Sequence, residues 1–118
     1  MSFKWFDYID LADRLIQDAS EAAYRSAISR AYYGAFCLAR DTAQLSDYGK
    51  TDVHKVVADQ YLHSSEGKKR LIGNKLEELR RNRNRADYND PFDQNRHINL
   101  KSLASISVHM AKKIAQDL

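Results

Sequence analysis

Apolar residues recur every three or four positions along most of this chain, the spacing that places them on one face of a helix. Near the carboxyl end this spacing is followed by Leu100, Leu103, Ile106, Met110 and Ile114. Capping residues and short breaks separate one periodic stretch from the next. The pattern predicts five helices, at about residues 7–19, 20–44, 51–63, 68–86 and 99–117.

Helix starts and stops are marked by capping residues and by one proline. Ser20 suits the N-cap of the second helix, and Thr51 or Asp52 suits that of the third, because side-chain oxygens accept hydrogen bonds from free backbone N–H groups. Asp90 precedes Pro91, and a residue before proline disfavours the helical conformation. We therefore expect the fourth helical stretch to end before this pair.

The second helix is expected to be the spine of the domain. Small residues recur along it every four positions, at Ala27, Ala31, Ala35 and Ala39. They would let another backbone approach closely. Tyr32 and Tyr33 are adjacent and cannot share a face, so we expect one to pack inside and the other to lie at a surface or an interface.

Composition supports an all-α fold. The 118 residues include four glycines and one proline, too few for the many tight turns of a sheet protein. Hydrophobic residues make up 43% of the chain, more than a disordered sequence carries. We predict a single domain over residues 1–118 that folds as an up-and-down bundle of four to five helices.

Three features predict a cytoplasmic protein without a membrane association. Cys37 is the single cysteine, so the chain cannot form an internal disulfide, as is usual in a reducing compartment. No apolar run approaches the roughly 20 residues that a membrane span needs. The first ten residues, MSFKWFDYID, carry acids where a signal peptide would be apolar.

Aromatic residues are abundant at the start of the chain. They are Phe3, Trp5, Phe6 and Tyr8. A bundle of this size would struggle to bury them together with the alanine-lined face of the second helix. We therefore predict a homodimer.

Positive charge is concentrated in the fourth helix, although the net charge of the chain is only +3. Residues 68–85 carry eight basic and two acidic residues, a local charge of +6. Such a concentration is typical of a surface that binds phosphate, most often that of RNA or another nucleic acid. The alternative is a solvated basic face. The candidate nucleic-acid contacts are Arg80, Arg81 and Arg85, with Arg30 and its helical neighbour Tyr33 on the second helix.

Arg83 occupies a position at which the apolar seam of the fourth helix predicts leucine. The seam consists of Ile72, Leu76 and Leu79. Because a guanidinium stays charged, Arg83 must either reach solvent at the edge of the core or meet an anion in a groove. Three polar residues follow within about a turn and a half: Asn84, Asp87 and Tyr88. Together these four side chains could form a cluster that holds phosphate.

No cofactor and no metal site are predicted. The histidines are spread over separate segments without the short ligand spacing of a zinc motif, at His54, His63, His97 and His109. The four glycines are isolated, so no glycine-rich phosphate loop is present. We expect His54 and His109 to be partly buried structural residues.

Three segments together resemble the HEPN superfamily, in its small stand-alone prokaryotic branch. They are RSAISRAYYGAFCLARDTA at 25–43, VHKVV at 53–57 and RNRADYND at 83–90, and their order and spacing agree over residues 20–115. The resemblance implies a bundle of four to five helices that dimerises, with the late helix of each protomer lining a shared cleft. Many HEPN proteins are metal-independent endoribonucleases, often toxins of toxin–antitoxin or phage-defence systems.

In active HEPN proteins the catalytic motif begins with an arginine, usually followed by a polar residue, and ends with a histidine that helps to transfer protons at the ribose 2′-hydroxyl. Arg83 and Asn84 match its first part. Asp87 and Tyr88 stand where the histidine is expected, and the next histidine, His97, lies beyond the proline. The resemblance thus makes Arg83, Asn84, Asp87 and Tyr88 the candidate catalytic residues.

Two functions stay open at this point. The first is an RNA-cleaving or RNA-binding, toxin-like protein whose dimer cleft presents the four candidate residues. The second is a non-catalytic module that binds nucleotide or RNA phosphate, or that partners a minimal nucleotidyltransferase acting as antitoxin. In that second case Tyr88 is a candidate modification site. A purely structural dimerisation bundle is the third and simplest alternative.

Overall fold

The computed structural model describes residues 2–45, 52–88 and 99–118, and within these ranges the chain forms helices joined by turns, with no strand. Five α-helices and one 3-10 turn follow one another: α1 (Phe6–Leu15), η1 (Ile16–Asp18), α2 (Glu21–Thr42), α3 (Val53–Leu62), α4 (Gly67–Tyr88) and α5 (Leu100–Asp117). The predicted all-α class and the five predicted helices are confirmed.

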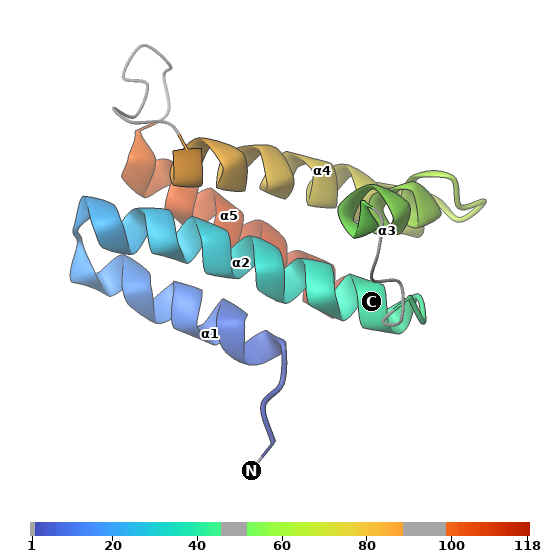
Figure 1. The fold of residues 1–118 in the computed structure, drawn as a ribbon, viewed down its shortest axis with the longest axis horizontal. Coiled ribbons are helices and arrows are strands. Elements are labelled where there is room, and N and C mark those ends of the chain that lie inside the picture. Colours follow the sequence, from blue (N-terminus) through green and yellow to red (C-terminus); the bar gives the residue numbers. More distant parts are fainter. Residues whose placement is uncertain (1, 46–51, 89–98) are drawn as a thin grey trace.

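Helix α2 lies at the centre of the bundle. It packs against α1, α4 and α5, while α3 packs mainly against α4. The helices α1, α2, α4 and α5 run in alternating directions, and α3 lies across one end beside the start of α4 (Figure 1). Among the helices in the described ranges, none combines the length and the apolar character needed to cross a membrane.

Three helices begin at a side chain that accepts a hydrogen bond from the backbone N–H three residues further on. The distances are 3.1 Å at Ser20 for α2, 3.2 Å at Asp52 for α3 and 2.8 Å at Asn99 for α5. Ser20 is therefore the predicted cap of α2, and Asp52 is the cap of α3. The other candidate for α3, Thr51, lies outside the described residues.

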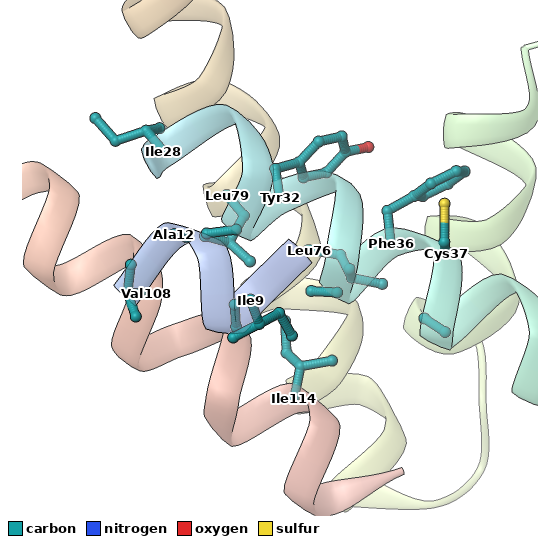
Figure 2. Close-up of a cluster of buried hydrophobic side chains, with 14 of the residues drawn as sticks. Ile9, Ala12, Ile28, Tyr32, Phe36, Cys37, Leu76, Leu79, Val108 and Ile114 are labelled. Atoms are coloured by element: carbon teal, nitrogen blue, oxygen red, sulfur yellow. The ribbon is translucent and has the colours of Figure 1, made fainter. Parts of the chain in front are cut away.

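The alanine stripe of α2 is buried inside the chain itself. Ala27, Ala31, Ala35 and Ala39 are all fully buried. Figure 2 shows larger side chains of the same core, among them Ile9, Ile28, Leu79, Val108 and Ile114. Burial of each such large side chain stabilises the fold by roughly 1.5–3 kcal/mol. The stripe is covered by other helices of the same chain, so the expectation that a bundle of this size could not readily bury it is wrong.

The apolar seam of α4 continues differently from the sequence-based expectation. Beyond Leu79 the buried positions are Asn82 and Ala86, whereas Arg83 lies beside them and is half-buried. Asn82 Nδ2 donates a hydrogen bond to Ser107 Oγ of α5 at 3.3 Å, and both side chains are buried. The pair satisfies two polar groups that would be costly to bury alone. Arg83 is thereby left at the edge of the core.

The carboxyl end of α4 extends to Tyr88, two residues beyond the predicted end at 86. Asp87 and Tyr88 consequently belong to the last helical turn, at helical spacing from Arg83. The Asp90–Pro91 pair that we expected to end this stretch lies outside the described residues.

Single residues of α2 and α5 test two further expectations, and the structure also places the single cysteine. Tyr32 is buried and Tyr33 is half-buried, so the predicted division between the two tyrosines is confirmed. Cys37 is buried in the core, and burial raises the pKa of its thiol. His109 is exposed on α5, which corrects the expectation that it is partly buried.

Candidate functional site

Arg83 is the centre of a polar cluster between α4 and α2. Its side chain is only 14% exposed, and each nitrogen of its guanidinium lies against a polar partner. Nη2 donates a hydrogen bond to the hydroxyl of Tyr33, and Nη1 donates to Asn84 Oδ1 at 2.5 Å. Nε lies 3.3 Å from Asp87 Oδ2 in an ion pair one turn along the helix.

Aromatic rings surround the same guanidinium. Arg83 Cζ lies 5.1 Å from the ring centre of Tyr33, 5.8 Å from that of Tyr88 and 5.9 Å from that of Tyr32. A cation within about 6 Å of a ring centre is attracted by the negative face of the ring. The side chains of Arg83, Tyr33, Asn84, Asp87 and Tyr88 are called the Arg83 cluster below.

Burial and pairing act in opposite directions on Arg83. Burial of the guanidinium disfavours its charged form, but the hydrogen bond to Tyr33 and the charge of Asp87 outweigh this effect and raise the pKa of Arg83. The side chain is therefore a permanent cation at every accessible pH. Its charge is held at a fixed place near the surface, where an incoming anion could replace the exposed carboxylate of Asp87.

The structure thus brings together all four candidate catalytic residues and places beside them Tyr33, one of the candidate nucleic-acid contacts. Tyr88 is 73% exposed, and its ring lies beside the guanidinium of Arg83. Arg30 continues the arrangement along α2, with its Cζ 5.5 Å from the ring centre of Tyr33 and 4.8 Å from that of Tyr8. Arginines and aromatic rings consequently alternate from Tyr8 of α1 to Tyr88 of α4.

Two of the other basic candidates of α4, Arg80 and Arg81, face α3. Arg80 Nη2 lies 3.8 Å from Asp52 Oδ1 at the start of α3. Arg81 is exposed, and both arginines line a groove of about 570 Å³ between α3 and α4 that also contains Glu77 and Glu78. Arg85 is half-buried. The basic segment is therefore divided between a mixed-charge groove and the cluster around Arg83.

His54 is a member of this site that sequence reasoning missed. It lies in the first turn of α3, half-buried, with Nδ1 2.5 Å from the hydroxyl oxygen of Tyr32. Its ring stacks on Phe36, with ring centres 4.4 Å apart, and lies 6.2 Å from the ring centre of Tyr33. His54 and Arg83 thus contact the same two tyrosines.

The charge states of the His54–Tyr32 pair follow from its surroundings. Burial lowers the pKa of His54 below its ordinary value of 6.5, and the charges of Arg80 and Arg83 lower it further. Burial also raises the pKa of Tyr32 well above its ordinary value. At neutral pH the site therefore holds a neutral imidazole hydrogen-bonded to a protonated phenol, beside the permanent charge of Arg83.

A second hollow in the surface contains none of the predicted site residues. It has a volume of about 600 Å³ and is lined by residues such as Thr42, Tyr61, Lys69 and Leu118. In the described ranges, no group of three or more histidine, cysteine or acidic side chains is placed to hold a metal ion. The Arg83 cluster with His54 is the strongest candidate site.

Comparison of the chain with family models, curated proteins and solved structures gives no match.

Proposed function

We propose that this protein is an RNA-binding endoribonuclease of the HEPN type that works without a metal ion and places the scissile phosphate on Arg83. The observation that carries the proposal is the half-buried guanidinium of Arg83, fixed by Tyr33 and Asn84 and neutralised by the accessible carboxylate of Asp87. The resemblance of residues 25–43, 53–57 and 83–90 to HEPN proteins supports the same function.

Arg83 suits a phosphate in both charge and shape. A guanidinium presents a planar fork that binds two phosphate oxygens at once. During cleavage by the neighbouring 2′-hydroxyl, negative charge builds up on the phosphate, so the contact with Arg83 is strongest in the transition state. A bound phosphate would take the place of Asp87 beside the guanidinium.

The experiment is a cleavage assay on a fluorescent RNA oligonucleotide with excess chelator. Arg83→Ala should lower the cleavage rate about 100-fold or more, while the remaining basic residues preserve much of the binding. Arg83→Lys should rescue poorly, because an ammonium lacks the planar fork. Arg14→Ala, an exposed position on α1, is the matched control. Equal cleavage by the wild type and Arg83→Ala would refute the proposal.

Nucleic-acid binding itself is tested by its salt dependence. The basic residues of α4 would release counterions from the RNA backbone, so affinity should fall steeply between about 50 and 200 mM salt. Replacement of Arg80 and Arg81 by alanine should weaken binding to all sequences alike, because such contacts position the backbone without reading bases. Fluorescence anisotropy measures both effects, and an affinity insensitive to salt would contradict this electrostatic account.

A homodimer belongs to the same proposal. Phe3 is 54% exposed and Phe6 is 36% exposed at the start of α1, which leaves apolar surface for a second copy. Two copies would present two Arg83 clusters to one RNA strand, in line with the shared cleft that the HEPN resemblance implies. Sedimentation at micromolar concentration is expected to give a dimer, and a monomer would count against this part.

A biological role as a toxin follows from RNA cleavage inside the cell. Induced expression should arrest growth of a bacterial host, and the Arg83→Ala variant should not. Growth arrest by both variants at equal protein levels would point to an effect unrelated to cleavage.

One observation favours the non-catalytic alternative. The Tyr88 hydroxyl is on a side chain that is 73% exposed and lies at the Arg83 cluster, so an enzyme could reach it. A minimal nucleotidyltransferase could attach a nucleotide there. Coexpression with a nucleotidyltransferase encoded beside this gene, followed by mass spectrometry, should then add a nucleotide mass to the wild type but not to Tyr88→Phe.

A further inference from the structure

The proposed cleavage needs a group that takes the proton from the attacking 2′-hydroxyl. A tyrosine hydroxyl is ordinarily protonated at neutral pH and so is a weak acceptor. The carboxylate of Asp87 lies 3.3 Å from Arg83 Nε, the place that a bound phosphate would take. Tyr88 is therefore poorly suited to this step, and Asp87 would be displaced from its present position when the phosphate binds.

His54 supplies a better acceptor from a different helix. Tyr33 is its link to the cluster: the ring centre of Tyr33 lies 6.2 Å from that of His54 and 5.1 Å from Arg83 Cζ, and its hydroxyl accepts a hydrogen bond from Arg83. Tyr32 forms a second link, with its ring centre 5.6 Å from that of His54 and 5.9 Å from Arg83 Cζ.

The hydrogen bond to Tyr32 engages Nδ1 of His54, so Nε2 is the ring nitrogen outside this pair. A neutral imidazole has one N–H and one acceptor nitrogen, and the Tyr32 hydroxyl can pair with either kind. When Nδ1 donates to the Tyr32 hydroxyl oxygen, Nε2 carries the free electron pair. The same arrangement remains satisfied after Nε2 takes up a proton, since both nitrogens are then donors. Tyr32 is thus a positioning residue for His54.

The charged and titratable neighbours of His54 favour its neutral form, which can accept a proton. Arg80 and Arg83 face it from α4, Asp52 caps its own helix, and Tyr32 and Tyr33 face it from α2. The two arginines disfavour an imidazolium while the site is empty. A bound phosphate would offset their charge and make protonation of His54 easier at the moment of reaction.

We propose that His54 is the proton acceptor of the cleavage reaction, with a 2′-hydroxyl at its Nε2 and the adjacent phosphate on Arg83. The inference rests on the proposed function. The 2′-oxygen loses its proton to Nε2 and bonds to phosphorus, and the bond from phosphorus to the 5′-oxygen breaks. The products are a 2′,3′-cyclic phosphate and a 5′-hydroxyl, whose proton comes from water. His54 then returns its proton to the solvent.

The test is the rate of cleavage of a single-stranded RNA oligonucleotide from about pH 5 to pH 9 with the full chain. The wild-type rate should rise with pH and then level off, as His54 loses its proton. His54→Gln should lower the rate by about 100- to 10,000-fold and remove this low-pH limb. Tyr32→Phe should lower kcat with KM unchanged. His109→Gln, an exposed histidine of α5, should behave as the wild type.

A second variant distinguishes loss of the proton acceptor from misfolding. His54→Ala should regain part of its activity when imidazole is added, which a merely structural role of His54 would not produce. Cleavage by His54→Gln at the wild-type rate, with Arg83→Ala inactive, would overturn this inference and leave the proposed function standing. Absence of cleavage by the wild type would overturn both.

Discussion

Arg83 and His54 are both basic side chains, but their surroundings give them different charge states at neutral pH. The guanidinium of Arg83 keeps its charge because Asp87 and Tyr33 compensate it. The imidazole of His54, packed on Phe36 and near two arginines, favours its neutral form. One permanent cation and one neutral acceptor therefore lie against the same tyrosine rings.

The lowered pKa of His54 predicts how stability depends on pH. The unfolded chain takes up a proton on His54 near its ordinary pKa of 6.5, whereas the folded protein does so only at a lower pH. The unfolded state then binds more protons, so this residue makes the free energy of unfolding fall as pH drops below about 6.5. Above that pH its contribution is constant.

Urea denaturation at several pH values measures this effect. The wild type should lose stability below about pH 6.5 more steeply than His54→Gln, because the variant lacks the group that titrates. His109→Gln, whose residue is exposed, should follow the wild type. Parallel curves for the wild type and His54→Gln would show that His54 is not the residue responsible.

The grouping of the candidate catalytic residues was predictable from the sequence only within one helix. Helical spacing places Arg83, Asn84, Asp87 and Tyr88 on one patch because all four belong to α4. It could not join them to His54, since that contact depends on how α2, α3 and α4 pack. The position of Arg83 beside the apolar seam could not be predicted for the same reason. It depends on the contact between Asn82 and Ser107 of α5.

At the scale of elements, the contact between α3 and α4 depends on one glycine. A Cβ on Gly73 of α4 would lie 2.8 Å from the backbone nitrogen of Leu62 and 2.9 Å from its Cγ. Glycine usually weakens the middle of a helix. Here it lets α4 approach the last turn of α3, the helix that carries His54.

Gly73→Ala should therefore destabilise the protein in spite of the better helix propensity of alanine. Overpacking against a backbone atom costs about 1–3 kcal/mol. Gly67→Ala is the matched control in the first turn of α4, where the nearest atom to the added Cβ is 3.5 Å away on the flexible side chain of Arg70. That variant should be neutral or gain up to about 1 kcal/mol. Equal thermal stabilities would contradict the close packing of α3 and α4.

At the scale of the whole molecule, the order and the lengths of the helices followed from local information. Apolar spacing and the caps at Ser20 and Asp52 are properties of short segments, and the structure agrees with them. What covers the alanine stripe could not be predicted from local sequence. Whether Ala31 and Ala35 face a second copy or helices of the same chain depends on where the rest of the chain runs.

The division of the site among three helices has a thermodynamic consequence. Tyr33 lies on α2, His54 on α3 and Arg83 on α4, so the unfolded chain lacks the assembled site and a ligand binds the folded state more tightly. Ligand binding must then raise the melting temperature. Binding of a ligand to the site can therefore be detected as a shift in melting temperature, without any knowledge of the reaction.

A short RNA with methylated 2′-oxygens, which cannot be cleaved, is a suitable probe. At about 100 times its dissociation constant it should stabilise the wild type by about 2.7 kcal/mol, a rise in Tm on the order of 10 °C. Arg83→Ala should show a somewhat smaller rise at the same concentration, because the remaining basic residues preserve much of the binding, and the exposed-site variant Arg14→Ala an equal one. Such a scan, repeated over nucleotides and RNA fragments, turns the stability of the bundle into a direct search for its natural ligand.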